Sequence, residues 1–160
     1  MIKIHDNLFI GNEYDCFDDD RVEWVVIHAC KSPCHQRAVG YRRNLNKNHP
    51  NYLILEKEKH LYLNMVDMNT MLSHDYTEPI IKAALNFIDR NINSKNVLIH
   101  CNQGNSRAPT LALLFLAKRK NILPNNNYGK AKIEFMKLFA NYIPGIGIDR
   151  YLENYWNDLK

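Results

Sequence analysis

The sequence predicts an α/β protein, a single domain in which a central, mostly parallel, twisted sheet is flanked by helices. Short β-branched runs alternate along the chain with segments of helical periodicity. A buried-looking strand at residues 96–101 passes through a polar loop directly into a helix. The length of 160 residues suits one domain spanning residues 1–160 with its own core.

The first half of the chain carries most of the expected strands. Residues 3–12 alternate enough for an opening strand, and residues 23–30, EWVVIHAC, form a β-branched run typical of the middle of a sheet. Residues 31–52 are polar and basic without a sustained period, which predicts a loop with a helical piece. Residues 52–67 predict two short strands, or one interrupted strand, ending at Asp67.

A well-marked helix follows a turn-rich patch. Thr77 is a candidate N-cap, Pro79 suits the first turn, and the apolar residues between 80 and 92 share one broad face. Residues 96–101, NVLIHC, then predict a short buried strand.

The last third of the chain is expected to be helical. Pro109 suits a helix first turn, and residues 110–120 are apolar nearly all round before a cationic end, which predicts a central helix. Residues 128–142 form an amphipathic pattern, and residues 148–156 predict a final helix.

Composition places the chain among ordinary globular proteins, with 46% hydrophobic and 24% charged residues. The net charge is +4, but opposite charges are interspersed, so we expect no nucleic-acid partner. The longest apolar run, LALLFLA from Leu111, is too short to cross a bilayer, and the N-terminus lacks a signal-peptide pattern. We therefore expect a cytoplasmic protein without a membrane partner; its oligomeric state is left open.

The cysteines form no regular framework, so we expect reduced thiols rather than disulfides. They are Cys16, Cys30, Cys34 and Cys101. The segment IHACKSPCH holds His28, Cys30, Cys34 and His35. Its spacing fits no common zinc pattern, and we expect neither a metal nor a cofactor.

The segment from Cys101 to Arg107 has the composition of an anion-binding device. Gly104 can adopt a positive φ, so the loop can turn its N–H groups inward at the start of a helix. A thiol there forms the nucleophilic thiolate more easily than a free one, and Arg107 can hold two phosphate oxygens at once. The expected phosphate-binding residues are Asn102, Gln103, Gly104, Asn105, Ser106 and Arg107.

The same residues resemble a known family. HCNQGNSR, from His100 to Arg107, matches the HCx5R signature of the cysteine-dependent protein phosphatases, and its GxSR ending is similar to the dual-specificity branch. LFIGN and YLNMVDMN resemble that family's opening strand and its general-acid segment. The resemblance implies Cys101 as nucleophile of a phosphocysteine intermediate, Arg107 as clamp, Asp67 as general acid and His100 as a supporting residue that orients the loop.

One residue departs from the family pattern. The residue after the arginine is usually Ser or Thr, whose hydroxyl is thought to stabilise the cysteine thiolate as it leaves the phosphoenzyme, whereas this chain has Ala108. Neither Ser106 nor Thr110 is expected to replace that hydroxyl. The resemblance thus implies a slow enzyme limited by phosphoenzyme hydrolysis. A catalytically weak phosphopeptide-binding module is the alternative from another class.

The expected substrate is a phosphorylated protein, with phosphotyrosine first and phosphoserine or phosphothreonine as further candidates. Phosphoinositide and RNA 5′-phosphatases of the superfamily tend to have basic loop residues, and they stay as alternatives although Asn102, Gln103 and Asn105 are neutral. The basic residues 37–49 either frame the pocket or form a solvated loop. Sequence alone does not give the pocket depth that decides among phosphorylated side chains.

Cys30 has two interpretations. The strand that ends there resembles the one that carries a resolving thiol in some phosphatases of the superfamily, which implies a disulfide with oxidised Cys101. The simpler interpretation is a small buried side chain.

Overall fold

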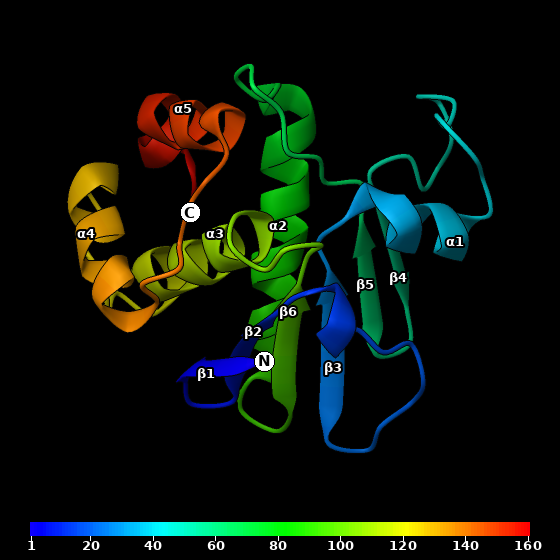
Figure 1. The fold of residues 1–160 in the computed structure, drawn as a ribbon, viewed down its shortest axis with the longest axis horizontal. Coiled ribbons are helices and arrows are strands. Elements are labelled where there is room, and N and C mark those ends of the chain that lie inside the picture. Colours follow the sequence, from blue (N-terminus) through cyan, green and yellow to red (C-terminus); the bar gives the residue numbers. More distant parts are fainter.

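Six strands form one mixed sheet in the order β1-β2-β6-β3-β5-β4 (Figure 1). The computed structural model describes residues 1–160. The strands are β1 (Ile2–His5), β2 (Leu8–Gly11), β3 (Trp24–His28), β4 (Ile54–Lys57), β5 (His60–Leu63) and β6 (Asn96–His100). The four central strands run parallel, whereas β1 and β4 pair antiparallel at the edges. The predicted central, mostly parallel sheet is confirmed.

Two strand boundaries differ from the sequence prediction. Residues 3–12 form a hairpin of β1 and β2 rather than one strand, because the chain reverses at Asn7, whose φ is 59°. Asparagine tolerates this conformation better than most residues. The strand expected to end at Asp67 stops at Leu63. Its parallel partner β3 ends at His28, opposite Tyr62, and beyond this point the ladder gives way to separate backbone hydrogen bonds, such as the one from Lys31 to the Met65 carbonyl.

Five helices accompany the sheet. They are α1 (Gln36–Val39), α2 (His74–Asn91), α3 (Arg107–Leu114), α4 (Tyr128–Leu138) and α5 (Ile146–Tyr155). Figure 1 shows α2 and α3 crossing beside the sheet, with α4 and α5 on the far side of α3 and α1 above β5 and β4. The central helix predicted from residues 110–120 is confirmed, since every residue from Ala108 to Ala117 is buried.

The helix expected to start at Thr77 begins earlier. Ser73 stands at its N-cap, and the N–H of Thr77 already donates to the Ser73 carbonyl over 2.9 Å. Thr77 is buried inside the helix and Pro79 lies beyond its first turn. Asp75 supplies the acidic residue that suits the positive end of the helix dipole.

The two faces of the sheet are covered unequally. Alternate residues of β3 and β6, such as Ile27 and Ile99, belong to a core of 38 buried residues shared with α2 and α3. On the other face Val26 and Leu98 form a cluster of only three buried residues, completed by Phe17. The second face is therefore held together by much less apolar contact than the first.

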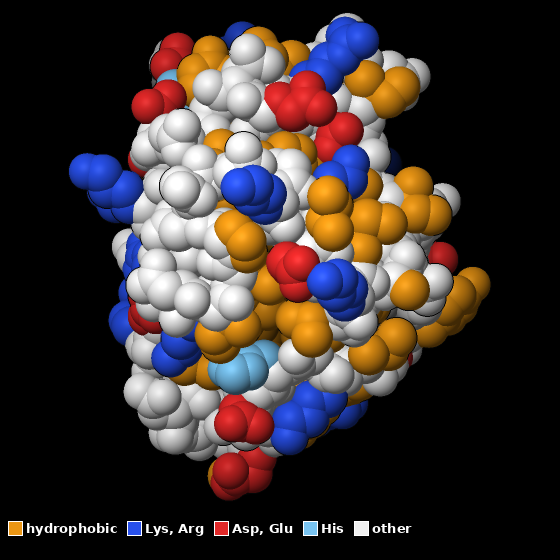
Figure 2. Space-filling view, turned by 90° about the vertical axis from the view of Figure 1, so that its left-hand side faces the viewer, with side chains coloured by type: hydrophobic (Ala, Val, Ile, Leu, Met, Phe, Trp, Pro, Cys, Tyr) orange, Lys and Arg blue, Asp and Glu red, His pale blue; other side chains and the backbone are white.

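The surface agrees with the mixed charge pattern of the sequence. Figure 2 shows the side of α4 and α5, where Lys and Arg side chains stand apart from one another among neutral, acidic and hydrophobic ones. No helix combines the length and the apolar character needed to span a bilayer.

Candidate functional site

The 101–107 loop connects the central strand β6, which ends at His100, to the central helix α3, which begins at Arg107. It lies at the carboxyl end of the parallel strands, where β3 and β6 finish side by side with His28 opposite His100. Gly104 adopts a φ of 79°, and a Cβ there would lie 2.9 Å from the Gly11 carbonyl oxygen. Both conformation and close approach therefore require glycine at this position.

The sulfur of Cys101 lies inside this loop. It is buried, at 2% exposure, and Sγ accepts hydrogen bonds from the N–H groups of Gly104 at 3.3 Å and Ala108 at 3.5 Å. Such donors stabilise negative charge on the sulfur. Four further loop amides have no acceptor within the chain and can serve an anion; they belong to Asn102, Gln103, Asn105 and Ser106.

Two contacts fix the guanidinium of Arg107. Nη1 donates to the Met65 carbonyl oxygen at 3.0 Å, and Nη2 donates to Oδ1 of Asn102 at 2.6 Å. Asn102 in turn donates through Nδ2 to the Ser32 carbonyl at 3.1 Å. Nε of Arg107 is buried without a partner. The arginine is thus held in place by two contacts, and one of its donors is buried without a partner.

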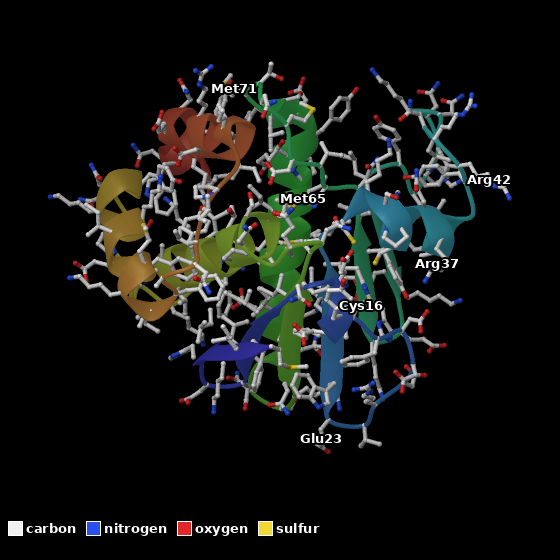
Figure 3. The ribbon with its side chains drawn as sticks, in the orientation of Figure 1. Cys16, Glu23, Arg37, Arg42, Met65 and Met71 are labelled. Carbon is white, nitrogen blue, oxygen red and sulfur yellow. The ribbon has the colours of Figure 1, made fainter.

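Met65 belongs to the segment that carries Asp67. Figure 3 shows Met65 near the start of α3, in the middle of the molecule. Its carbonyl also accepts the N–H of Lys31 at 3.1 Å, so it joins this segment both to Arg107 and to the chain after β3.

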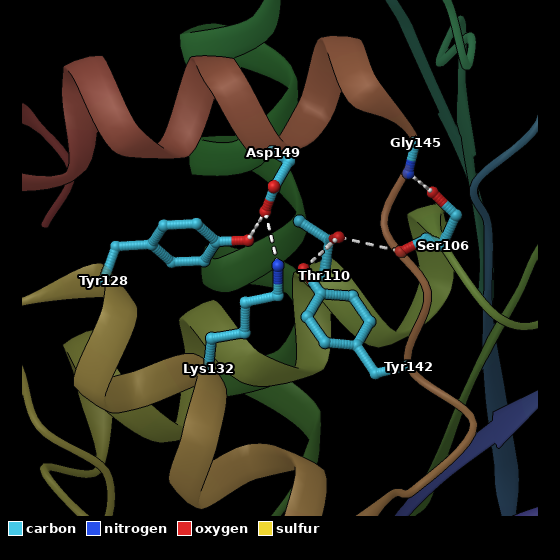
Figure 4. Close-up of polar contacts among 7 residues, drawn as sticks. All are labelled: Ser106, Thr110, Tyr128, Lys132, Tyr142, Gly145 and Asp149. Carbon is cyan, nitrogen blue, oxygen red and sulfur yellow. Dashed lines mark hydrogen bonds and ion pairs between the residues drawn. The ribbon is translucent and has the colours of Figure 1, made fainter.

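Asp67 reaches the loop through Gly145. The carboxylate is exposed and lies against Gly145, where an added Cβ would be 1.8 Å from Oδ1. The N–H of Gly145 donates to Oγ of Ser106 over 2.9 Å, a contact drawn in Figure 4. One glycine therefore separates Asp67 from the 101–107 loop. Among the neighbouring acids, Asp89 forms an ion pair with Arg119 instead.

The hydroxyl groups near Ala108 have other partners. Oγ1 of Thr110 donates to the Ser106 carbonyl at 2.7 Å and lies 2.9 Å from the Tyr142 hydroxyl (Figure 4). Oγ of Ser106 accepts the Gly145 N–H. Ala108 is fully buried and offers only its N–H to the sulfur.

His100 lies on the second face of the sheet and links Cys101 to a buried histidine pair. Its Nδ1 is 3.4 Å from the Cys101 carbonyl, and its Nε2 is 2.7 Å from Nδ1 of His28. Nε2 of His28 is 3.0 Å from Nδ1 of His60. Burial alone would lower the pKa of His100. The hydrogen bond to Cys16 and the negative charge of that thiolate outweigh burial, so the pKa of His100 is raised.

Cys30 follows β3 as Cys101 follows β6, and both line one cavity of about 370 Å³. A hydrogen bond from Cys34 lowers the pKa of Cys30 to about 7, against the effect of burial. The segment IHACKSPCH does not act as a unit, because His35 points to Tyr41 and to the carbonyl of Asn51.

Several residues of the site have no signal in the sequence. Met65 and Ser32 contribute only carbonyl oxygens, which every residue type has. Gly145 stood in a turn-like segment, IPGIG, whose closeness to Asp67 depends on the tertiary fold. Cys16 is distant from the other site residues in the sequence. The fold brings its Sγ to 3.6 Å from Nδ1 of His28 at the end of β3.

Comparison with known proteins agrees with this geometry. Residues 26–139 match the model of the dual specificity phosphatase catalytic domain. A "dual specificity protein phosphatase YVH1" of Plasmodium falciparum is 40% identical over 146 residues, which span 85% of this chain and 24% of that protein.

Solved structures share the fold. The human tyrosine phosphatase-like serine/threonine/tyrosine-interacting protein has a TM-score of 0.65 at 16% identity, covering 98% of this chain and 95% of that one. The Yvh1 phosphatase domain of Chaetomium thermophilum has a TM-score of 0.60 at 18% identity, covering 96% and 92%. The signature loop, the family match and this fold together show that the chain belongs to the dual specificity phosphatase family.

Proposed function

We propose that this chain hydrolyses phosphate esters on protein side chains through a cysteinyl-phosphate intermediate. The carrying observation is the 101–107 loop, in which Cys101 Sγ receives two amide hydrogen bonds and Arg107 keeps a buried, unpaired Nε donor. A nucleophile and a fixed cationic donor on one short loop suit attack on a bound phosphate.

In the first step, the Cys101 thiolate attacks phosphorus, an S–P bond forms and the bond from phosphorus to the side-chain oxygen breaks. Asp67 gives its proton to the leaving oxygen. Arg107 and the loop amides stabilise the charge on the three remaining phosphate oxygens. The two contacts that already orient Arg107 reduce the reorganisation this step needs.

In the second step, water attacks the cysteinyl phosphate and the S–P bond breaks. The Asp67 carboxylate takes a proton from the water, inorganic phosphate forms and the thiolate is restored. Two amides assist the departing sulfur, but residue 108 adds no hydroxyl. We therefore propose that this step limits turnover.

The substrate proposed is a phosphotyrosine protein, with phosphoserine and phosphothreonine proteins as further candidates. Asn102, Gln103 and Asn105 add no positive charge to the loop, which suits a single phosphate better than a polyanion. Exposed Arg37 lines the cavity that contains Cys101 and supplies a cation at its rim for acidic residues of a peptide.

The test is a substrate panel of a phosphotyrosine peptide, matched phosphoserine and phosphothreonine peptides, a phosphoinositide and a 5′-phosphorylated RNA. Wild type and Cys101→Ser are compared for phosphate release and for peptide binding. We expect phosphotyrosine hydrolysis by wild type and binding without release by Cys101→Ser. Release that survives Cys101→Ser contradicts the proposed nucleophile.

The same panel separates an enzyme from a binding module. A wild-type protein that binds the phosphotyrosine peptide but releases no phosphate, even in the first turnover, would be a binding module. Faster hydrolysis of the phosphoinositide or the RNA than of any peptide would contradict a protein substrate and identify that compound class as the substrate.

A further inference from the structure

Four side chains from separate parts of the sequence meet on the second face of the sheet, behind the 101–107 loop. One sulfur or ring-nitrogen atom from each lies within 4.8 Å of the corresponding atoms of the other three, and the residues are Cys16, His28, Cys34 and His100. We propose that these four residues bind one zinc ion. The proposal does not depend on phosphatase activity.

The atoms are spaced much as zinc requires. A tetrahedral site with bonds of about 2.3 Å to sulfur and about 2.0 Å to nitrogen places its ligand atoms about 3.3 to 3.8 Å apart. Cys16 Sγ lies 3.6 Å from Nδ1 of His28, and Cys34 Sγ lies 4.0 Å from Nε2 of His100. The two ring nitrogens are 2.7 Å apart and need to separate by less than about 1 Å.

The other nitrogen of each imidazole already has an acceptor. Nε2 of His28 faces Nδ1 of His60 at 3.0 Å, and Nδ1 of His100 faces the Cys101 carbonyl at 3.4 Å. Both histidines can therefore donate through the nitrogen that faces away from the cluster and leave the inward nitrogen as a lone pair. Zinc-bound histidines are typically oriented by such outer hydrogen bonds.

The donor set selects the metal. Two thiolates and two imidazoles in a tetrahedral arrangement suit zinc, whereas magnesium and calcium prefer oxygen. On binding, Zn²⁺ replaces the thiol protons of Cys16 and Cys34, which are released to solvent. The charge of the ion is then balanced by the two thiolates.

A zinc ion at this position would cross-link four segments on the second face of the sheet. Cys16 comes from the turn after β2, His28 and His100 end the two central strands, and Cys34 belongs to the Lys31–His35 turn. Figure 3 places Cys16 beside the carboxyl end of β3. This face has only three residues in its apolar cluster, so a metal joining four segments adds the cross-links that the small cluster lacks.

The first experiment measures metal on the full chain. Protein freed of metal by a chelator is titrated with Zn²⁺ against a chromogenic competitor, and separately with Co²⁺. We expect one tight equivalent of Zn²⁺. Co²⁺ should give the intense visible bands of a tetrahedral site and a near-ultraviolet thiolate charge-transfer band. Absence of a stoichiometric Zn²⁺ equivalent, or an octahedral Co²⁺ spectrum, overturns the proposal.

Variants locate the site. Cys16→Ser and Cys34→Ser should each weaken Zn²⁺ binding at least a hundredfold and remove the tetrahedral Co²⁺ spectrum. Cys30→Ser and Cys101→Ser are matched controls, because both residues line the same cavity but stand outside the cluster. Both should retain the full equivalent. A loss of metal in a control and its retention in Cys16→Ser would place the metal elsewhere.

A third measurement needs no substitution. Wild-type protein is treated with an alkylating reagent in excess Zn²⁺ or in chelator, and each cysteine is followed by mass spectrometry. Zinc should slow alkylation of Cys16 and Cys34 at least tenfold and leave the rate at Cys101 unchanged. It should also raise the Tm of wild type and Cys30→Ser, but not that of Cys16→Ser. Equal alkylation of Cys16 and Cys34 with and without zinc contradicts the proposal.

Discussion

The Asp67 carboxylate rests on the backbone of Gly145, where no side chain intervenes. A Cβ on Gly145 would lie 1.8 Å from Oδ1 of Asp67, and the N–H of the same glycine binds Ser106 of the 101–107 loop. The position of the proposed acid relative to the 101–107 loop is therefore set by one residue.

Gly145→Ala is expected to move the acid without unfolding the protein. The φ of −58° and ψ of 153° suit alanine, and the clash falls on the end of a flexible side chain. We expect kcat toward a phosphotyrosine peptide to fall roughly a hundredfold or more, because general acid catalysis typically contributes about 10²- to 10⁴-fold, with KM and Tm little changed. Gly129→Ala is the control, because its Cβ meets only a side-chain oxygen at 3.4 Å. An unchanged kcat in Gly145→Ala would remove Asp67 from the mechanism.

Asn102→Ala is expected to loosen the clamp. It removes the acceptor of Arg107 Nη2 and the tie to the Ser32 carbonyl. A hydrogen bond to a charged group is worth about 1.5 to 3 kcal/mol, so kcat/KM should fall roughly ten- to a hundredfold. Exposed Gln103 offers a control in the same loop, and Gln103→Ala should stay close to wild type. Equal losses in both variants would contradict a special role for Asn102.

Ala108→Ser is expected to raise the steady rate. If departure of the Cys101 thiolate limits turnover, wild type shows a burst of leaving group from an aryl phosphate followed by a slow phase. A hydroxyl at position 108 should speed the slow phase roughly tenfold or more. Ala112→Ser adds the same group one helical turn away in the same buried helix and should give no gain. A wild type without a burst, together with an Ala108→Ser variant without a gain, would refute the slow second step.

Cys30 is proposed as the resolving thiol for oxidised Cys101. Peroxide converts the Cys101 thiolate to a sulfenic acid, and the Cys30 thiolate then attacks that sulfur, forming a disulfide and expelling hydroxide, which takes a proton from solvent to give water. Both residues line one cavity. Activity of peroxide-treated wild type should return with thiol reductant, whereas Cys30→Ser should lose it irreversibly. Equal recovery, without a Cys30–Cys101 peptide by mass spectrometry, would exclude the role.

Tyr142 should weaken the fold at high pH. Burial raises the pKa of Tyr142 to about 12, whereas a tyrosine in the unfolded chain has a pKa of about 10. The native state therefore keeps a proton that the unfolded chain loses, and the free energy of unfolding falls between about pH 10 and 12 while staying intact below. Tyr142→Phe should flatten this decline in urea unfolding, whereas Tyr14→Phe, at a residue 88% exposed, should not. Identical curves for all three proteins would contradict the assignment.

Sequence reasoning reached the sheet, the central helix and the Cys101–Arg107 loop because each depends on local chemistry. The β-branched run before His28 and the apolar run after Arg107 have the composition of their elements. Gly104 was recognisable because its conformation excludes most other residues. The start of α2 was misplaced because Ser73 and Thr77 are both residue types that suit an N-cap, and the structure places the cap at Ser73.

The remaining parts of the site depend on contacts between distant segments. The carbonyl of Met65 and the α-carbon of Gly145 belong to the candidate site through position alone, so their residue types do not predict these contacts. The grouping of Cys16 and His100 with His28 and Cys34 requires the strand order of the sheet. Spacing within IHACKSPCH could not show it, because half of the cluster lies outside that segment.

The shared carbonyl of Met65 bears on how the protein meets its ligand. By accepting both Arg107 and the N–H of Lys31, it ties the acid-bearing segment to the arginine and to the chain after β3 before any phosphate arrives. The entropic cost of ordering these segments is then met when the protein folds, and it does not recur each time a ligand binds. Under the proposed function, a phosphorylated side chain would therefore bind to segments that are already joined to one another.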